Sequence, residues 1–421
     1  MKNNKFLYIC LICILCLFNF NQVTAFNKLN LDVKNYCVYD VGSKRFLDCP
    51  SQNVKIYPAS ITKLAVAMLA YDIIPSNTVI EVGLEIQKTP KYSSIMGLSY
   101  GDKVNFNDLM AGFIIASGND AGNVLAVNIA RIFSNQKNLT YDQAMPIFLS
   151  LLTDKLNKIG TKATSFVNAH GFYDPDHYTT ADDLIKIALA AIEYPEIKKL
   201  SSLKKYNSES GKWSFNSHNE FLLRNKYAKG LKTGFVNESG YNLLGFAKNQ
   251  GQELIFLVYG AKSKEGRYQA ANDITNYYFN NYNQRSIPFK YEWLVSNGDI
   301  GSSQTINIDF NLESLSLSND EATNLRIEYN FDDSLLEVKD DILTIKHDLY
   351  ANEKVGSYTI YNLDKVVMIG DMTLVENIFV NNILGMIKYY LFRYWYLSLI
   401  VLIILMILII KPKRKRKRAR F

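Results

Sequence analysis

Ser60 and Lys63 are the pair of side chains best suited to nucleophilic chemistry in this chain. They lie in the segment Tyr57-Pro58-Ala59-Ser60-Ile61-Thr62-Lys63, directly before the apolar run 64–71. That run is apolar nearly all round, which predicts a helix buried inside a domain. Ser60 then falls in its first turn, where backbone N–H groups are unpaired, and Lys63 lies one turn further on the same face. Apolar surroundings disfavour a charged lysine, so Lys63 could be the base that activates Ser60.

A serine three residues before a lysine is a weak signal by itself. For Ser60 and Lys63 alone, a helix cap beside a surface lysine is an equally good interpretation. The same spacing recurs among polar neighbours at Ser134/Lys137, Ser201/Lys204 and Ser202/Lys205. The rest of the sequence has to decide between the two interpretations.

A second motif, Ser117-Gly118-Asn119, lies between two predicted helices at Asn107–Ala116 and Asn119–Phe133. A short polar loop between buried helices can point its side chains into a cleft. Capping of the second helix by Ser117 or Asn119 is the alternative. The Ser-x-Asn pattern also recurs at 214–216 and 217–219.

A third motif, Lys232-Thr233-Gly234, occurs once, in a predicted strand at 230–236. Two more strands are predicted at Tyr241–Lys248 and Glu253–Tyr259. A glycine inside a strand lets a ligand backbone approach closely, and the lysine and threonine beside it could donate hydrogen bonds to a carboxylate.

No metal or cofactor is predicted. His170 and His177 lie near one another, but no third or fourth ligand with metal spacing accompanies them. We expect both histidines to be structural. Further helices are predicted at Gln143–Ile159, interrupted near Pro146, and from the cap Thr180 to Ile192.

The two ends of the chain carry signals of export and membrane anchoring. Residues 1–25 combine Lys2 and Lys5, an apolar core and the small-residue site Val23-Thr24-Ala25, which is typical of a secretory signal peptide. After a juxtamembrane segment at 377–393, the apolar stretch 394–410 predicts a transmembrane helix. The basic tail 411–421 predicts that the C-terminus is cytoplasmic and the catalytic part lies outside the cell membrane.

The charge distribution argues against a nucleic-acid partner. Of the formal net charge of +7, the tail supplies eight positive charges and the signal peptide two, which leaves the exported part near −3. That part keeps Cys37 and Cys49, which flank a predicted hairpin of Tyr36–Asp40 and Lys44–Cys49. They could pair outside the cytoplasm. A three-residue loop would place them opposite each other and a two-residue loop would not, so the sequence leaves this disulfide open.

The composition changes after about residue 282. Residues 283–376 contain short alternating segments separated by turn clusters, which predict a small all-β domain. The exported chain is therefore expected to divide into a catalytic domain at 26–282 and this all-β domain.

In order and surroundings, the three motifs resemble those of the D-alanyl-D-alanine carboxypeptidases, the low-molecular-mass penicillin-binding proteins of the penicillin-recognising serine acyl-transferase superfamily. The resemblance spans about residues 35–282. It implies an α+β fold, with an antiparallel sheet flanked by helices and a helical lobe across the cleft, and a trailing β-domain and membrane anchor are also family features. It is carried by Pro58–Lys63, Ser117–Ala121, Asn168–Gly171, and Gly230–Gly234 with Gly240–Leu243.

The resemblance implies a role for each site residue. Ser60 attacks the carbonyl between the two terminal D-alanines of a peptidoglycan stem peptide, with Lys63 as its base. Ser117 and Asn119 relay protons and hold the peptide. Lys232 and Thr233 meet the terminal carboxylate beside Gly234, and Arg267 clamps it. The oxyanion hole is the backbone N–H of Ser60 and of Phe235, and β-lactam antibiotics are expected to inhibit the enzyme.

One departure from the family concerns carboxylate recognition. The family often has His-Thr after Lys-Thr-Gly, whereas this chain has Phe235 and Val236, so a second hydroxyl is missing. The oxyanion N–H does not depend on the side chain. For Arg267, a surface arginine at a helix start is the alternative interpretation.

Two other functions compete with the carboxypeptidase. A β-lactamase of class A would need a Glu-x-x-x-Asn loop between Asn119 and Lys232, which this sequence lacks, and would lack the β-domain. A membrane-tethered penicillin-binding sensor or scaffold would need a signalling tail, and the eleven-residue tail holds only a basic cluster. Endopeptidase action, stem-peptide preference and oligomeric state stay open.

Overall fold

The computed structural model describes residues 29–285, 290–296, 303–309, 315–318, 325–331, 336–339, 342–345, 349, 351–362 and 365–374. Its contacts divide into two units: the first holds most of residues up to 280, and the second holds residues from 281 onward with the ends of two hairpins. The predicted signal peptide, juxtamembrane segment and transmembrane helix lie outside the described residues. Within the described ranges, no helix has the length and apolar character needed to cross a bilayer.

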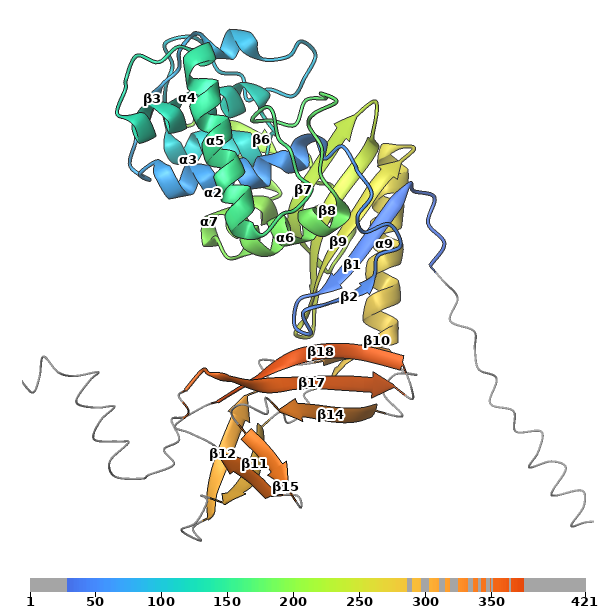
Figure 1. The fold of residues 1–421 in the computed structure, drawn as a ribbon. Coiled ribbons are helices and arrows are strands. Elements are labelled where there is room, and N and C mark those ends of the chain that lie inside the picture. The colour runs from blue at the N-terminus through green and yellow to red at the C-terminus, as the bar shows by residue number, and fades with distance from the viewer. Residues whose placement is uncertain are drawn as a thin grey trace, which may run out of the picture. The chain divides into compact units, whose positions relative to one another are not determined.

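A five-stranded sheet forms one layer of the first unit (Figure 1). Its middle strand carries the apolar run Leu254–Val258, which is buried throughout because helices cover both faces of the sheet. One of these helices, α9 (Lys264–Asn281), packs along the sheet through side chains such as Tyr268 and Ile274. The strands in spatial order are β2 (Arg45–Asp48), β1 (Asn35–Asp40), β9 (Gln252–Ala261), β8 (Gly240–Asn249) and β7 (Ala228–Val236).

The other helices form a lobe around α2 (Lys63–Ile73), as the sequence predicts. All eight residues from Lys63 to Ala70 are buried, and α2 contacts α3, α4, α5, α6 and α7. The lobe consists of η1 (Ala59–Thr62), α2, η2 (Leu84–Lys88), α3 (Phe106–Ile114), α4 (Asn119–Ser134), α5 (Tyr141–Ile159), α6 (Ala181–Ile192), α7 (Pro195–Ser202) and α8 (Phe221–Arg224), with two short ribbons, β3 (Val79–Glu81) with β4 (Lys103–Asn105) and β5 (Lys205–Asn207) with β6 (Ser214–Asn216).

Helix ends follow the predicted capping in one case and differ in another. The Thr180 hydroxyl accepts a hydrogen bond from the Asp183 N–H (3.2 Å) at the start of α6, as predicted. The predicted interruption near Pro146 is wrong, because α5 runs unbroken from Tyr141. A capping box at Thr140 and Gln143 starts the helix ahead of the proline, which lies in the second turn and removes one backbone hydrogen bond there.

In the second unit, every element that the structure describes after α9 is a strand. A seven-stranded sheet has the order β14-β17-β18-β12-β11-β16-β15, and β10 pairs with β13. The strands are β10 (Tyr282–Arg285), β11 (Lys290–Ser296), β12 (Ser303–Asp309), β13 (Leu315–Ser318), β14 (Leu325–Phe331), β15 (Leu336–Lys339), β16 (Ile342–Ile345), β17 (Lys354–Asn362) and β18 (Lys365–Leu374).

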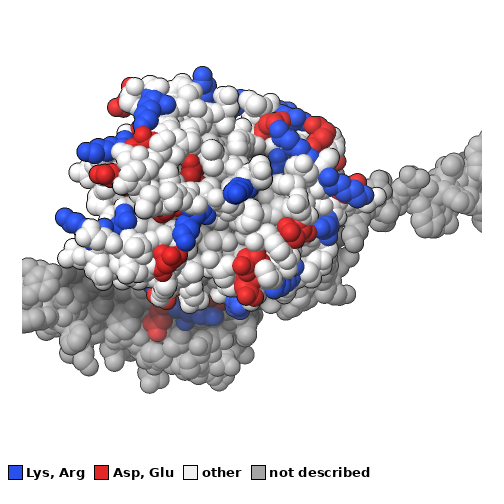
Figure 2. Space-filling view, turned by 90° about the horizontal axis from the view of Figure 1, so that it is seen from above, with Lys and Arg blue, Asp and Glu red and all other residues white. Residues whose placement is uncertain are grey.

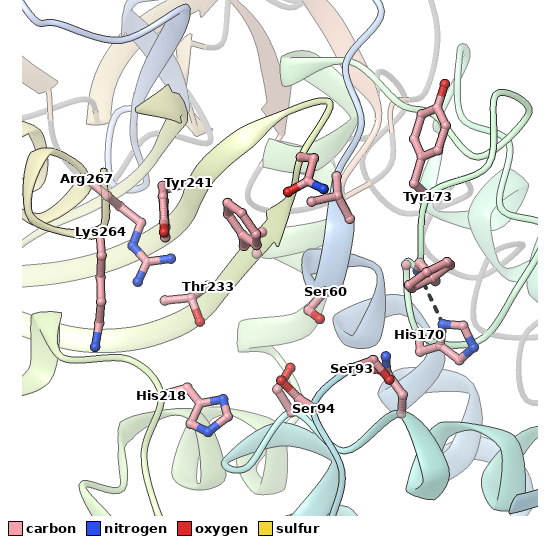
Figure 3. Close-up of a pocket in the computed structure, with 18 of the residues that line it drawn as sticks. Ser60, Ser93, Ser94, His170, Tyr173, His218, Thr233, Tyr241, Lys264 and Arg267 are labelled. Carbon is pink, nitrogen blue, oxygen red and sulfur yellow. Dashed lines mark hydrogen bonds between the residues drawn. The ribbon is translucent and has the colours of Figure 1, made fainter. Parts of the chain in front are cut away.

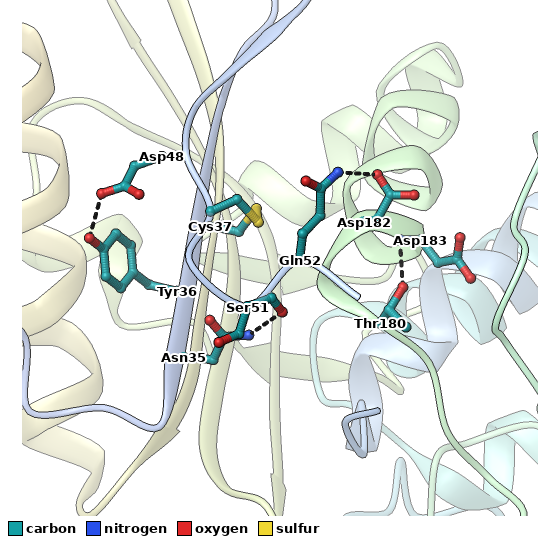
Figure 4. Close-up of a disulfide and its surroundings, with 10 residues drawn as sticks. Asn35, Tyr36, Cys37, Asp48, Ser51, Gln52, Thr180, Asp182 and Asp183 are labelled. Atoms are coloured by element: carbon teal, nitrogen blue, oxygen red, sulfur yellow. Dashed lines mark hydrogen bonds between the residues drawn. A yellow bond between two sulfur atoms is a disulfide. The ribbon is translucent and has the colours of Figure 1, made fainter. Parts of the chain in front are cut away.

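Cys37 in β1 and Cys49, just after β2, form a disulfide (Figure 4). The hairpin has a four-residue connection at 41–44, longer than either loop weighed from the sequence. The Tyr36 hydroxyl donates to Asp48 (2.5 Å) across the same two strands. The structure therefore contains the pairing that the sequence left open.

We predict that this disulfide stabilises the catalytic unit. Replacing both cysteines by serine should lower the free energy of unfolding by about 2–4 kcal/mol, because the cross-link restricts the unfolded chain. Urea denaturation of the oxidised protein and of the Cys37→Ser/Cys49→Ser variant measures the difference, and reduced wild type serves as the control. Alkylation of both thiols in the native protein without prior reduction would contradict the pairing.

Candidate active site

Ser60 lies in the 3-10 turn η1, and Lys63 is the first residue of α2. Lys63 Nζ is 2.9 Å from Ser60 Oγ, so the two side chains share one face as predicted. The same nitrogen donates hydrogen bonds to Asn119 Oδ1 (2.7 Å) and to the backbone carbonyl of His170 (2.9 Å). Three segments far apart in the sequence are thus joined at one amine.

These contacts fit a neutral Lys63. Carbonyl oxygens only accept hydrogen bonds, so two amine protons are taken by Asn119 and His170. In a neutral amine the third position is a lone pair, and it then faces the hydroxyl of Ser60. Burial, followed by the nearby charge of Lys232, holds the pKa of Lys63 well below its ordinary value, and Asp120 opposes this only in part.

A second lysine–serine pair faces the first. Ser117 follows α3 with a left-handed φ of 57°, and Lys232 Nζ donates to its Oγ (2.9 Å) and to the Thr233 carbonyl (3.3 Å). Lys232 is buried, and its pKa is lowered to about 7 by burial and by the charge of Arg267. It can therefore change its charge near neutral pH.

Strand β7 passes directly against the turn that carries Ser60. A Cβ added at Gly234 would lie 2.7 Å from the Pro58 carbonyl oxygen and 3.3 Å from the Ser60 nitrogen, so only glycine lets the two backbones come so close. This packing brings the next residue, Phe235, to the edge of the site, and Phe235 is 48% exposed.

These motifs line one open cavity of about 690 Å³ (Figure 3). Arg267, Lys264 and His218 gather at one end, and His170 and Tyr173 lie at the other, with Ser60 between them. Burial and the charges of Lys232, Lys264, Lys63 and Arg267 lower the pKa of His218 to about 4, so this imidazole is neutral at physiological pH. Of the nine predicted site residues, Ser60, Ser117, Asn119, Thr233, Gly234, Phe235 and Arg267 line the cavity, and Lys63 and Lys232 contact it from behind.

Arg267 is buried, with 4% of its surface exposed, which excludes the alternative of a surface arginine. Its Nη1 donates to the Asn242 carbonyl (3.3 Å) and its Nη2 to the Tyr268 hydroxyl (2.7 Å). Among the described residues, its Nε–H has no hydrogen-bond partner. The guanidinium is thus fixed by two hydrogen bonds, its Nε–H is buried, and Arg267 lines the cavity.

The sequence did not reveal the wall opposite Ser60, which carries Ser93 and Ser94 (Figure 3). The carboxylate of Asp120 holds this loop by accepting hydrogen bonds from the backbone N–H of Met96 (2.7 Å), Gly97 (2.9 Å) and Leu98 (3.0 Å). A carboxylate next to Asn119 was the only signal for this contact. His218 was also missed, because its Ser-x-Asn match looked like a chance repeat.

The two histidines of the 168–177 segment are buried, as expected for structural residues. The backbone carbonyl of His170 accepts a hydrogen bond from Lys63, and His177 Nε2 lies 2.8 Å from Thr62 Oγ1. The described residues contain no group of His, Cys, Asp and Glu that could hold a metal ion. On the face in Figure 2, basic and acidic side chains are interspersed.

Comparisons with known proteins agree on one family. A family model described as D-alanyl-D-alanine carboxypeptidase matches residues 22–263. D-alanyl-D-alanine carboxypeptidase DacD of Salmonella typhimurium is 26% identical over 370 residues, covering 83% of this chain and 87% of the relative. D-alanyl-D-alanine carboxypeptidase DacC of Escherichia coli is 28% identical over 260 residues, covering 59% of this chain and 62% of the relative. The crystal structure of penicillin binding protein 5 from Haemophilus influenzae shares the fold, with a TM-score of 0.68 at 22% identity over 83% of this chain and 98% of that chain.

The buried histidines predict a loss of stability in acid. Burial lowers the pKa of His170 and of His177 to about 3, against about 6.5 in an unfolded chain. Below pH 6.5 the unfolded chain therefore binds protons that the folded chain does not, and stability falls as the pH falls towards 3. When the pH falls from 7 to 5, each histidine should lower the free energy of unfolding by about 2 kcal/mol.

Urea unfolding of wild type and His177→Gln at pH 7 and pH 5 tests this prediction. The fall in the free energy of unfolding from pH 7 to pH 5 should be smaller by about 2 kcal/mol in the variant, since glutamine does not titrate. An equal drop in both proteins would show that His177 is protonated in the folded state.

Proposed function

The chain belongs to the D-alanyl-D-alanine carboxypeptidase family of serine peptidases, and from that membership we propose that it works through an acyl-enzyme on Ser60. The proposal rests on the hydrogen bonds of Lys63. Its two N–H groups donate to carbonyl oxygens, so the lone pair of the neutral amine faces the Ser60 hydroxyl. The proposed substrate is a peptidoglycan stem peptide that ends in D-Ala-D-Ala.

In acylation, Lys63 takes the proton of Ser60 Oγ while the oxygen attacks the carbonyl carbon between the two D-alanines. The resulting oxyanion is proposed to be bound by the backbone N–H of Ser60 and of Phe235. The close approach of β7 to the Ser60 turn at Gly234 supports this pairing. Such donors are fixed before the charge develops, which is why they stabilise the transition state.

Collapse of the tetrahedral intermediate breaks the C–N bond, and the leaving amine of D-alanine needs a proton. Ser117 and Lys232 are the proposed donors, because Lys232 Nζ is 2.9 Å from Ser117 Oγ and has a pKa of about 7. Ser117 gives its proton to the amine and takes one from Lys232, and the proton that Lys63 took from Ser60 then replaces the one lost from Lys232. Neutral Lys63 next takes a proton from the water that adds to the Ser60 ester, and it returns this proton to Ser60 Oγ as the shortened peptide is released.

The cationic end of the cavity is proposed to hold the terminal carboxylate. Thr233 and Arg267 line that end, and Lys232 lies behind it. Val236 cannot donate a hydrogen bond from its side chain, which leaves these three residues to bind the anion. A β-lactam offers a carboxylate beside a reactive carbonyl, so we propose that β-lactams acylate Ser60 and inhibit the enzyme.

The cellular setting is also a proposal. The apolar stretch 394–410 and the basic tail 411–421 support a single anchor in the cell membrane, with residues 26–282 and 283–376 forming an extracytoplasmic catalytic domain and an all-β domain. Division of the contacts near residue 280 supports the domain boundary.

Release of D-alanine from a defined pentapeptide tests the proposed function. The wild-type protein should release one D-alanine per peptide, and Ser60→Ala should lower kcat/KM by at least about 10³-fold, because the nucleophile is gone. A labelled penicillin should attach to the wild type, and peptide mapping should find it on Ser60. Labelling that persists in Ser60→Ala would contradict the assignment.

Arg267→Ala should lower kcat/KM on the same peptide by roughly 10–200-fold, since a hydrogen bond to a charged group contributes about 1.5–3 kcal/mol. Arg224→Ala, at an exposed arginine outside the cavity, is the control and should stay near wild type. With the peptide C-terminus amidated, the wild type should slow down and Arg267→Ala should lose little more, because the partner is already absent. If the loss in kcat/KM caused by amidation and the loss caused by Arg267→Ala multiply when combined, Arg267 does not bind the carboxylate.

A further inference from the structure

Ala59, the residue before the nucleophile, has a left-handed backbone conformation with φ of 52°. A residue with a Cβ disfavours this region by about 1–2 kcal/mol, so the surrounding structure has to hold it in place. The peptide between Ala59 and Ser60 sets the direction of the Ser60 N–H and the start of its side chain. The contacts that hold Ala59 therefore bear on the reaction.

A chain of three hydrogen bonds ends on the Ala59 carbonyl. The backbone N–H of Val167 donates to His177 Nδ1 (3.1 Å), so this nitrogen is unprotonated and Nε2 carries the hydrogen. Nε2 then donates to Thr62 Oγ1 (2.8 Å), and the Thr62 hydroxyl donates to the Ala59 oxygen (2.8 Å). Each donor and acceptor in this series has a single consistent direction.

The imidazole is fixed in place and in charge. His177 is 2% exposed and stacks on Phe166, with ring centroids 4.7 Å apart and an angle of 8° between the planes. Its pKa of about 3 is set by burial; the nearby Asp174 raises it and Lys63 lowers it. The ring is neutral wherever the enzyme works, so the hydrogen-bond series keeps its direction.

The same segment reaches the catalytic base. The backbone of Gly171 lies against Ala59, and a Cβ there would be 1.8 Å from the Ala59 oxygen and 2.9 Å from Thr62 Oγ1. The preceding carbonyl, of His170, accepts a hydrogen bond from Lys63 Nζ. One buried segment thus contacts both the turn before Ser60 and the amine that activates it.

We propose that His177 and Thr62 are positioning residues that hold the Ala59–Ser60 peptide in its left-handed turn, so that Ser60 Oγ faces Lys63 and the Ser60 N–H faces the cavity. This inference rests on the proposed function of Ser60. It assigns a task to a buried histidine that does not line the cavity.

Acylation by a fluorescent penicillin, followed by stopped flow in the full chain, separates the acylation rate constant from the dissociation constant of the first complex. Thr62→Val should lower the rate constant by about 10- to 100-fold, as for a misplaced nucleophile, and change the dissociation constant by less than about twofold. Thr62→Ser keeps the hydroxyl and should stay near wild type. Thr180→Val, a buried hydroxyl that caps α6 nearby, controls for lost stability and should acylate at the wild-type rate.

A rescue experiment distinguishes positioning from general stabilisation. Glycine adopts a left-handed turn without cost, so Ala59→Gly added to Thr62→Val should restore the rate by about fivefold or more. His177→Phe keeps an aromatic ring beside Phe166 but loses both nitrogens, and it should also slow acylation. The His177→Phe/Thr62→Val double variant should be about as slow as the slower single variant, because both break one series of hydrogen bonds.

The inference is overturned if Thr62→Val acylates at the wild-type rate, if Thr180→Val is slowed as much, or if Ala59→Gly gives no rescue. Failure of the wild type to be labelled at Ser60 is a separate result and would overturn the proposed function itself. Incomplete labelling at long times reports unfolded protein, whereas complete but slow labelling reports misplacement.

Discussion

The arrangement of the active site depends on keeping one lysine amine uncharged inside the protein. Lys63 lies within a helix buried on all sides, and its amine contacts one hydroxyl and two carbonyl oxygens. Burial makes the charged form costly, and Lys232 adds a second unfavourable charge, so the neutral amine is favoured. In the proposed mechanism the apolar lobe around α2 therefore serves catalysis as well as stability, because a solvated lysine would be protonated and could not act as a base.

The other elements of the site place hydrogen-bond acceptors around that amine and pack against the turn that carries Ser60. The first residue of α4 is Asn119, which accepts a hydrogen bond from Lys63, and the 168–177 segment supplies the His170 carbonyl. Strand β7 packs against the Ser60 turn because Gly234 has no side chain. Ala59 and Ser117 both have left-handed backbones in this arrangement, and we propose that the hydrogen bonds of His177 and Thr62 hold Ala59 in place. Lys232, with a pKa of about 7, donates a hydrogen bond to Ser117 Oγ, which is the contact behind its proposed proton exchange.

The sequence predicted those parts of the fold that depend on local pattern. The all-apolar run after Lys63, the Thr180 cap and the glycine in β7 are found as expected, because periodicity, capping and backbone contact leave direct traces in sequence. It left the Cys37–Cys49 pairing open, because that pairing depends on the geometry of the hairpin. It did not reveal the hydrogen bonds of Asp120 to the loop at 96–98, which join distant segments, and it wrongly predicted an interruption at Pro146, where α5 continues.

The rate of acylation by penicillin as a function of pH, in wild type and Lys63→Arg, tests the central claim most directly. A neutral lysine base predicts a rate that rises to a plateau, with an apparent pKa well below the value of about 10.4 for a free lysine. Arginine stays protonated and should lower the plateau by at least about 100-fold, in line with the worth of a general base. A Lys63→Arg enzyme that keeps more than about one hundredth of the wild-type rate would contradict the account.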